Sequence, residues 1–376
     1  MKYLSLFSGI GAFEKALDRL KKQYELVGYC EIDKYASKSY SAIHNVPETL
    51  NLGDITKVDE KALPKDIDLI TYGFPCQDIS IAGKQKGLFN EDGTRTRSGL
   101  FFEALRIIEE TQPKVAIAEN VKNLTGKTFK KQFEIVLNSL DAAGYNNYWQ
   151  VLNAKDFGIP QNRERVFIVS IRKDIDTKAF CFPPGFPLKL CLKDLMEVSV
   201  AERFFVNTDP AADLIQKVKN GEIEMGVFRS DSIIKIGEIS SSQDGVVVSE
   251  NGIAPTHTAG HGNTPKVLIS ISNLPCTTRE KQIAGALVAS IYKQGGRNLI
   301  ANIESNLGYE GVIDNEFRLR KYTPLECFRL MGFDDADHAQ AEAVNSNTQL
   351  YKQAGNSIVV SVPQAIFEKL FEANIL

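Results

Sequence analysis

The sequence predicts an α/β protein: a mostly parallel sheet covered by helices on both faces, joined to a smaller, irregular domain that contains short strands. Short apolar runs alternate with amphipathic stretches over roughly the first 175 residues, a rhythm typical of parallel sheets. The segment 182–187, Phe-Pro-Pro-Gly-Phe-Pro, interrupts this rhythm. From there to about residue 312 the chain is rich in Ser, Gly and Asn and shows no sustained helical period.

The elements of the first domain follow in order along the chain. Strands are predicted at 3–7, 26–30, 68–73, 114–118, 148–152 and 165–171. Helices are predicted at 13–20, 100–110 and 129–143, and again near the C-terminus at 322–331 and 362–371. Ligands of such sheets bind at the carboxyl ends of the strands, so we expect the functional residues there.

Length, composition and charge narrow the class of protein. A chain of 376 residues favours one large domain plus a smaller one. The net charge of −3 weighs against a passive nucleic-acid coat protein, although a local cleft can still be basic. No apolar run approaches the roughly 20 residues of a membrane helix, and the chain starts directly in a strand-like run without a leader. We therefore expect a cytoplasmic protein with no membrane partner.

The cysteine pattern predicts reduced thiols and no metal site. Six cysteines occur, at positions 30, 76, 181, 191, 276 and 327, without a C-x-x-C pair. His257 and His261 lie close in sequence but have no third ligand nearby.

A glycine-containing turn follows the first predicted strand. Gly9 and Gly11 allow the backbone to turn tightly and to approach a ligand closely. Glu31, at the end of the next strand, is suited to accept hydrogen bonds from a ribose, and Asp54 is suited to accept from an adenine amine. The third glycine of a dinucleotide fingerprint is absent, so a pyrophosphate loop is disfavoured. The turn alone is equally compatible with an ordinary strand–helix connection.

Cys76 has the setting of a nucleophile. It follows the predicted strand 68–73 in the run Gly-Phe-Pro-Cys-Gln at 73–77, and proline stiffens the backbone that presents it. The Gly- and Lys-rich stretch 83–87 comes soon after, which is unusual for a core residue. A thiol needs a favourable local field to ionise near neutral pH.

Charged residues follow or enter two further strands. Glu119 follows the predicted strand 114–118, where a partly apolar site would raise its pKa and suit it to act as a general acid. Arg163 and Arg165 alternate into the apolar strand 165–171, so both side chains can point into one cleft. Paired donors there can hold a phosphate, a base edge or a carboxylate.

Taken together and in this order, these blocks resemble the DNA (cytosine-5) methyltransferase family. The matching blocks are Leu-Phe-Ser-Gly-Ile-Gly at 6–11, Gly-Phe-Pro-Cys-Gln at 73–77, Glu-Asn-Val at 119–121, Gln-Asn-Arg-Glu-Arg at 161–165, the stretch 320–333, Gln-Ala-Gly-Asn-Ser at 353–357, and the segments 81–87 and 96–100. The resemblance covers roughly 1–175 and 318–365. It implies a Rossmann-like, S-adenosylmethionine-dependent methyltransferase sheet and a bacterial or phage enzyme, either orphan or part of a restriction-modification system.

The resemblance also implies a mechanism. The thiolate of Cys76 would add to C6 of a flipped-out cytosine while Glu119 protonates or hydrogen-bonds N3, and C5 would then accept the methyl group. Arg163 and Arg165 would hold the base and the catalytic residues. The residues implied for S-adenosylmethionine are Phe7, Gly9, Ile10, Gly11, Glu31, Ile32, Asp54, Ile55, Phe74, Asn356 and Ser357.

The partner implied by the resemblance is double-stranded DNA. The implied DNA contacts are Gln77, Ser80, Lys84, Lys86, Arg97, Thr256 and His257. Residues 1–182 and 335–376 would form the catalytic domain, 186–317 the target-recognition domain, and 318–334 a connecting helix. The segments 251–256 and 260–264 would contain the recognition loops. We expect a monomer; a cognate restriction endonuclease, if one exists, would act separately.

The chain departs from the family pattern at two positions. Ser5 occupies a position where many relatives carry Asp, and Ala12 replaces a usual glycine.

Three rival functions compete with this interpretation. A nucleotide-binding dehydrogenase would explain the glycine turn and Glu31 but not the Cys76 and Arg-x-Arg blocks. An RNA cytosine-5 methyltransferase with the same chemistry is the second rival, and a catalytically silent DNA-binding relative is the third. The large middle domain favours duplex DNA, and a silent relative would be expected to lack Cys76 or Glu119.

Overall fold

The computed structural model describes residues 1–80, 86–241, 245–257, 265–270 and 317–376. They group into two compact units. Unit 1 comprises Met1–Leu190, Ala254–Asn263 and Cys327–Leu376, and unit 2 comprises Cys191–Ile253 and Thr264–Glu326. Among the described residues, no helix has the length and apolar character required to cross a membrane.

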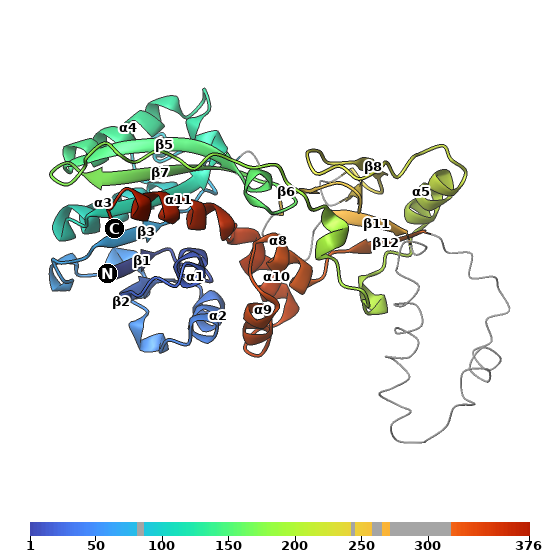
Figure 1. The fold of residues 1–376 in the computed structure, drawn as a ribbon, viewed down its shortest axis with the longest axis horizontal. Coiled ribbons are helices and arrows are strands. Elements are labelled where there is room, and N and C mark those ends of the chain that lie inside the picture. The colour runs from blue at the N-terminus through green and yellow to red at the C-terminus, as the bar shows by residue number, and fades with distance from the viewer. Residues whose placement is uncertain (81–85, 242–244, 258–264, 271–316) are drawn as a thin grey trace, which may run out of the picture. The chain divides into compact units, whose positions relative to one another are not determined.

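Unit 1 is built on a six-stranded sheet with the order β2-β1-β3-β4-β7-β5 (Figure 1). The strands are β1 (Lys2–Leu6), β2 (Glu25–Cys30), β3 (Leu69–Tyr72), β4 (Val115–Val121), β5 (Tyr145–Asn153) and β7 (Glu164–Arg172). The pairs β1–β2, β1–β3 and β3–β4 are parallel, whereas β7 runs antiparallel to both β4 and β5. The predicted α/β class with a mostly parallel sheet is confirmed.

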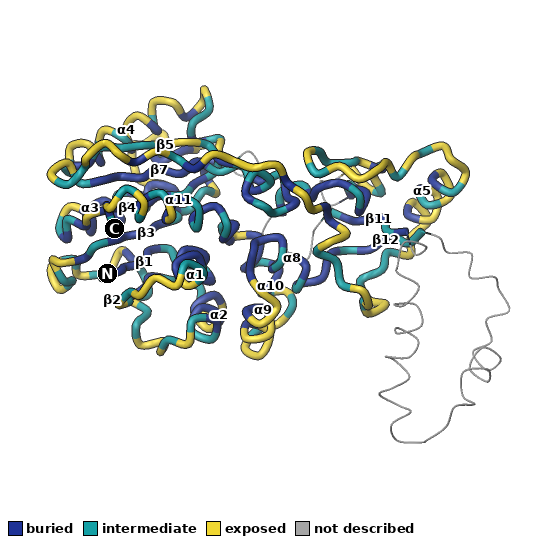
Figure 2. The backbone as a smooth tube through the Cα atoms, viewed as in Figure 1, coloured by how far each residue is buried: buried dark blue, intermediate teal, exposed yellow. Residues whose placement is uncertain are grey.

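Helices cover both faces of this sheet. On one face, α3 (Phe101–Thr111) and α4 (Lys130–Ala142) pack on alternate strand residues that include Leu4, Ile70 and Ala116. On the other face, α1 (Ala12–Arg19) carries Glu14, which accepts a hydrogen bond of 3.1 Å from Tyr3 of β1. Figure 2 shows β3, β4 and β7 buried, while the outer turns of α9 are exposed. Burial on both faces explains why these strands are almost continuously apolar.

The remaining helices of unit 1 pack on the sheet or on the helices that cover it. They include α2 (Lys34–His44), α9 (Asp335–Glu342), α10 (Asn347–Asn356) and α11 (Ser361–Glu372), while α8 (Pro324–Leu330) contains the boundary between the two units. A short parallel pair joins β6 (Gln161–Asn162) to β10 (Ala254–Pro255), so the segment from Ala254 groups with unit 1 rather than with the rest of 186–317. Short 3₁₀ turns occur in unit 1 at Glu48–Leu50, Ile55–Lys57, Glu60–Ala62, Ser98–Leu100, Lys122–Thr125 and Ala154–Phe157, and in unit 2 at Leu192–Leu195 and Glu202–Phe204.

Unit 2 contains a four-stranded sheet and one helix of its own among the described residues. The sheet has the order β12-β11-β9-β8, from β12 (Phe317–Lys321), β11 (Lys266–Ser270), β9 (Val246–Ser249) and β8 (Lys235–Glu238). Helix α5 (Asp209–Lys219) contradicts the expectation of no helical period before residue 312. Its buried residues Ala211, Leu214 and Val218 have helical spacing, and Pro210 stands in its first turn, but the polar residues between them mask the pattern.

Two other expectations differ from the structure. Strand β4 continues through Glu119 to Val121, because antiparallel β7 pairs along its whole length, with Val121 opposite Arg165. Helices α2, α9 and α10 were not predicted. Their mean apolar character is low, and the few residues that they bury become apparent only when they pack against each other.

Phe101 provides a test of the core. Its side chain is fully buried, and its ring centroid lies 5.5 Å from that of Phe74. We expect Phe101→Ala to lower the free energy of unfolding by about 3–5 kcal/mol, because it leaves a cavity in close-packed surroundings. Urea unfolding monitored by the fluorescence of Trp149, the single tryptophan of the chain, measures this change. The control Ile135→Ala, on the outer side of α4, should cost less than about 1 kcal/mol. Equal costs for the two variants would contradict this packing.

Candidate functional site

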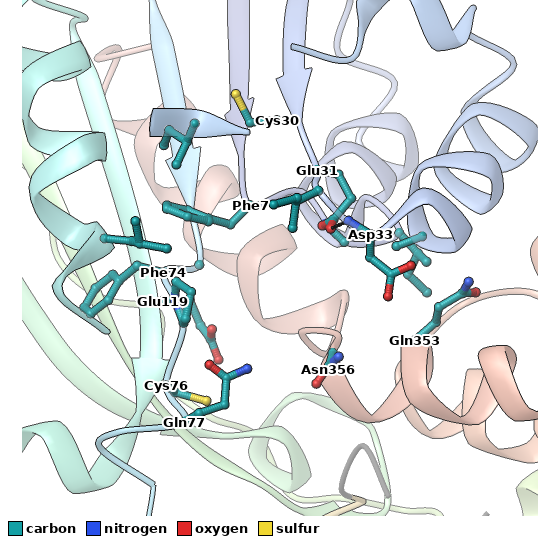
Figure 3. Close-up of a pocket in the computed structure, with 18 of the residues that line it drawn as sticks. Phe7, Cys30, Glu31, Asp33, Phe74, Cys76, Gln77, Glu119, Gln353 and Asn356 are labelled. Atoms are coloured by element: carbon teal, nitrogen blue, oxygen red, sulfur yellow. Dashed lines mark hydrogen bonds between the residues drawn. The ribbon is translucent and has the colours of Figure 1, made fainter. Parts of the chain in front are cut away.

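A cavity of about 310 Å³ in unit 1 lies at the carboxyl ends of the parallel strands. Figure 3 shows the Cys76 thiol and the Glu119 carboxylate at one end of it, and Glu31 and Asp33 at the other. The predicted residues that line the cavity are Phe7, Gly9, Ile10, Glu31, Ile32, Asp54, Ile55, Phe74, Cys76, Gln77, Glu119, Arg163, Arg165 and Asn356. Residues that are far apart in the sequence therefore share one site.

The turn after β1 has the left-handed backbone that its glycines allow. Gly9 has φ of 58° and Gly11 of 80°, and even Phe7 has a positive φ of 54°. Gly11 does not line the cavity. A Cβ at this position would lie 2.1 Å from Nε2 of His44, so the glycine is needed for packing beneath the turn. The structure therefore accounts for Gly11 by packing, and its contact with a cofactor stays a prediction.

The carboxylate of Glu31 is held by two backbone amides. Gly9 N donates to one oxygen at 2.9 Å, and Asp33 N donates to the other at 2.7 Å. Burial raises the pKa of Glu31, although both amides oppose the shift. A carboxylate oxygen can accept more than one hydrogen bond, so Glu31 can still accept hydrogen bonds from hydroxyl groups in the cavity.

Asn51 is a supporting residue that the sequence analysis missed. Its Oδ1 accepts from the amides of Glu31 at 3.0 Å and Gly53 at 2.9 Å, and its Nδ2 donates to the carbonyl of Glu31 at 2.9 Å. One side chain therefore links the Glu31 loop to the segment that carries Asp54. Its position two residues before Gly53 was the available signal, but an isolated Asn in a loop is too common to stand out.

The wall near Glu31 combines apolar and acidic groups. Ile32 is 76% exposed and lines the cavity, which offers an apolar surface to a ligand. The carboxylate of Asp54 caps the 3₁₀ turn that begins at Ile55, and hydrogen bonds from the hydroxyl and amide of Thr56 lower its pKa. Asp54 therefore remains an ionised acceptor at neutral pH.

Cys76 stands at the start of a turn that follows β3. Its carbonyl accepts from the amides of Ile79 at 3.0 Å and Ser80 at 2.8 Å. The Nδ2 of Asn120, on neighbouring β4, donates to the carbonyl of Phe74 at 3.0 Å and so fixes the approach to the cysteine. Burial and the negative charge of Glu119 raise the pKa of the thiol, against the opposing charges of Arg165 and Arg163.

Glu119 forms an ion pair with Arg165. Its Oε1 lies 3.0 Å from Nε of Arg165, and its side chain is 12% exposed. Burial raises the pKa of Glu119, and the charges of Arg165 and Arg163 limit the rise. A raised pKa makes a carboxyl group better suited to carry the proton that a general acid donates. The cysteine and the carboxyl group are electrostatically coupled, since each negative charge disfavours the other.

Arg163 is buried and hydrogen-bonded to backbone carbonyls. Its Nη1 donates to His257 O at 2.7 Å, and its Nη2 donates to Ser357 O at 2.7 Å and Gly355 O at 3.0 Å. Burial lowers the pKa of Arg163 to about 9, so the group still carries its charge at neutral pH. The prediction that Arg163 and Arg165 share one cleft agrees with the cavity wall.

The residues expected to contact DNA are in different environments. Gln77, Lys86 and Arg97 are exposed and Ser80 is half-buried, while Lys84 and the segment 260–264 lie outside the described residues. The hydroxyl of Thr256 donates to Asn162 O at 2.7 Å. His257 is only 1% exposed, and its ring nitrogen lies 3.3 Å from Tyr351 O. The expectation that its side chain contacts DNA is corrected, because the ring is buried and its ring nitrogen lies next to the carbonyl of Tyr351.

Asn356 and Ser357 border a second, smaller pocket beside the cavity. Its volume is about 50 Å³, and Ser5, Gly9 and Glu119 also line it. Ser5 is buried at the base of this pocket, so a hydroxyl group stands at the position where the family pattern has a carboxylate. The pair 356–357 is thus brought to the site from the C-terminal part of the chain, as predicted.

Three comparisons with known proteins all point to methyltransferases. The model of the family described as C-5 cytosine-specific DNA methylase matches residues 1–372. The orphan methyltransferase M.SPRI of Bacillus phage SPR is 35% identical, over 100% of this chain and 98% of its own length. The type II methyltransferase M.HhaI of Haemophilus parahaemolyticus is 33% identical, over 97% and 93%. The structure of Entamoeba histolytica methyltransferase EhMeth has the same fold, with a TM-score of 0.65 and 16% identity over 100% of this chain and 98% of that one.

The coupling between Cys76 and Glu119 predicts a change in thiol reactivity. Because burial and Glu119 raise the pKa of Cys76, alkylation of this thiol by iodoacetamide should still be rising with pH at pH 9.0. Glu119→Gln removes the opposing charge and should speed alkylation at pH 8 by about three- to tenfold. Mass spectrometry of the Cys76 peptide measures the rate, and exposed Cys181 in the same digest is the internal control. An unchanged or slower rate in the variant would show that the two groups are not coupled.

Proposed function

The chain belongs to the C-5 cytosine-specific DNA methylase family, and on this premise we propose that Cys76 is the nucleophile that attacks the target cytosine. The protein is an enzyme that methylates cytosine C5 in DNA and uses S-adenosylmethionine as methyl donor. The observation that carries the proposal is the shared cavity: Cys76 and Glu119 lie at one end and Glu31 at the other, and Asp54 also lines it.

The cavity has the chemistry that a nucleoside cofactor requires. Phe7 and Ile32 offer apolar surfaces for the faces of an adenine, Glu31 offers acceptors for ribose hydroxyls, and Asp54 offers an acceptor for the adenine amine. The smaller pocket beside Ser5 and Asn356 suits the methionine end. When bound, S-adenosylmethionine supplies an electrophilic methyl group to C5 of the cytosine.

Cys76 and Glu119 would act together on the cytosine ring. The thiolate adds to C6, which makes C5 nucleophilic, and loss of the C5 proton later expels the cysteine. Protonation of Glu119 removes the charge that adds to burial in raising the pKa of Cys76, so it favours the thiolate. The protonated carboxyl group is also the form that donates to N3 of cytosine. The same protonation state, with Glu119 neutral and Cys76 a thiolate, therefore suits both residues to their proposed roles.

The two arginines would hold this arrangement. Arg165 pairs with Glu119 and fixes the direction of its carboxylate. Arg163 is anchored to three carbonyls and places its charge next to the cavity. Because a cytosine within a duplex cannot reach the partly buried thiol, the target base must be flipped out of the helix. The proposed DNA contacts remain Gln77, Ser80, Lys84, Lys86, Arg97 and Thr256, of which Lys84 lies outside the described residues.

The substrate proposed is duplex DNA, with unit 2 as the target-recognition domain. The family description names DNA, which favours this substrate over RNA. Cys76 and Glu119 are both present in the cavity, which disfavours a catalytically silent protein. We also propose a cytosolic monomer that works separately from any restriction endonuclease. Light scattering of the purified protein measures its oligomeric state.

Methyl transfer from labelled S-adenosylmethionine to duplex DNA tests this proposal. Cys76→Ala and Cys76→Ser should lower the rate by about a thousandfold or more, because the nucleophile is lost. Glu119→Gln should lower it by about 10²- to 10⁴-fold. Sequencing of the product would locate the label on cytosine C5 and reveal the recognised sequence. Cys181→Ser, which removes an exposed thiol, is the matched control and should retain full activity.

Two outcomes would overturn these assignments. Activity that persists in both Cys76 variants would exclude this residue as the nucleophile. Label found in RNA and not in DNA would show that RNA is the substrate of the same reaction. A duplex containing 5-fluorocytosine gives an independent test, since fluorine at C5 cannot leave as a proton does. It should form a denaturant-resistant complex with the wild type and none with Cys76→Ala.

A further inference from the structure

Helix α10 is attached to the Glu31 loop by an ion pair near the cavity. Nζ of Lys352 lies 2.6 Å from Oδ2 of Asp33, across a sequence separation of 319 residues. The other carboxylate oxygen of Asp33 accepts from Tyr35 N at 2.9 Å and caps α2. Lys352 and Asp33 both line the cavity. The pair therefore connects two elements at the point where the loop between β2 and α2 borders the cofactor end, and Figure 3 shows Asp33 beside Glu31.

The position of Asp33 determines the orientation of the Glu31 carboxylate. Both oxygens of Glu31 accept hydrogen bonds from backbone amides, one from Gly9 and one from Asp33. A shift of the Asp33 backbone would therefore rotate or release the carboxylate. Gly9 belongs to the turn after β1. The amide of Asp33 is therefore the contact that holds the Glu31 carboxylate to the loop between β2 and α2.

We propose that Lys352 is a positioning residue for cofactor binding: by holding Asp33, it keeps the Glu31 carboxylate directed at the ribose hydroxyls of S-adenosylmethionine. This inference rests on the proposed role of Glu31. Lys352 acts on Glu31 through Asp33 and needs no contact with the cofactor.

Stability alone is a poor explanation for this ion pair. The side chains are 38% and 25% exposed, and such a pair contributes little to folding. The attachment of α10 to α2 has another, buried contact, since Ser39 Oγ donates to Gln353 Oε1 at 2.8 Å. Helix α10 should therefore remain in place when Lys352 is replaced. What the replacement changes is the restraint on Asp33.

The charge of Lys352 also acts on the acidic end of the cavity. Glu31 and Asp33 line this end, and the ammonium group of Lys352 opposes the rise in pKa that burial causes at Glu31. Its hydrogen bond and charge hold the pKa of Asp33 below the usual value, against the effect of burial. The neighbouring titratable groups on β2 are Tyr29 and Cys30, whose own pKa values are raised by burial and by Glu31. Without Lys352, burial would raise the pKa of Glu31 further. Protonation would then remove acceptor capacity at a higher pH than in the wild type.

Calorimetric titration of the full chain with S-adenosylmethionine and with S-adenosylhomocysteine tests the proposal. We expect Lys352→Met to raise both Kd values by about five- to thirtyfold, with kcat at saturating cofactor changed by less than about threefold. The acid limb of the plot of log Kd against pH should move to higher pH. Lys352→Arg should restore most of the affinity, since it keeps the cation. Lys369→Met is the matched control, because it removes a partly exposed lysine that pairs with Glu372 at 2.6 Å on α11.

A double-mutant cycle separates positioning from general damage. Asp33→Asn removes the charge but retains a good helix cap, so it should weaken cofactor binding about as much as Lys352→Met. The double variant should lose little more than either single variant, since both changes break the same contact. Urea midpoints of the variants should stay close to that of the wild type.

The outcomes distinguish this inference from the proposed function. If Glu31→Gln weakens cofactor binding and Lys352→Met leaves Kd within twofold of the wild type, Lys352 has no positioning role while the role of Glu31 stands. If Glu31→Gln itself leaves Kd unchanged, the proposed role of Glu31 is wrong. Fully additive effects in the double variant would show that Lys352 and Asp33 act separately, and would also overturn the inference.

Discussion

The active site depends on one buried cation. The guanidinium group of Arg163 donates to carbonyls of His257, Gly355 and Ser357, from segments 94 and more residues away in sequence. A buried charge is costly unless its hydrogen bonds are satisfied, so these carbonyls must stay in place around it. The same group lines the cavity beside Cys76. The catalytic end of the site is thus fixed by an interaction that also joins the C-terminal helices to the sheet.

The antiparallel strand β7 is the second constraint. It pairs with β4 so that Val121 lies opposite Arg165, which brings the arginine to within 3.0 Å of Glu119. A parallel strand in the same position would carry its residues along the sheet in the opposite direction and place a different side chain next to Glu119. The proton equilibrium of the Glu119 and Cys76 pair follows from this register, because Arg165 limits the rise in pKa of both groups.

Helix α10 connects the two ends of the cavity. Lys352 reaches the loop that orients Glu31, while the carbonyl of Gly355 accepts from Arg163. The residues proposed to bind the cofactor and the target cytosine are therefore both supported by contacts from one short helix. This arrangement would keep the two binding regions in a fixed relation, which is what a reaction between two bound molecules requires.

The sequence by itself determined the α/β class and the strands of the parallel half of the sheet. It also picked out Cys76, Glu119, Glu31 and Asp54 as candidate functional residues, which the structure brings to one cavity. These depend on local patterns: apolar runs set the strands, and reactive side chains follow them at the edge where ligands bind. Only the tertiary structure decided that the His257 ring is buried, that Gly11 packs against His44, that Asn51 supports the Glu31 loop, and that Lys352 pairs with Asp33. The physical reason is that each of these contacts joins elements whose proximity is created by packing, and no local periodicity or spacing records which distant residue will supply the partner.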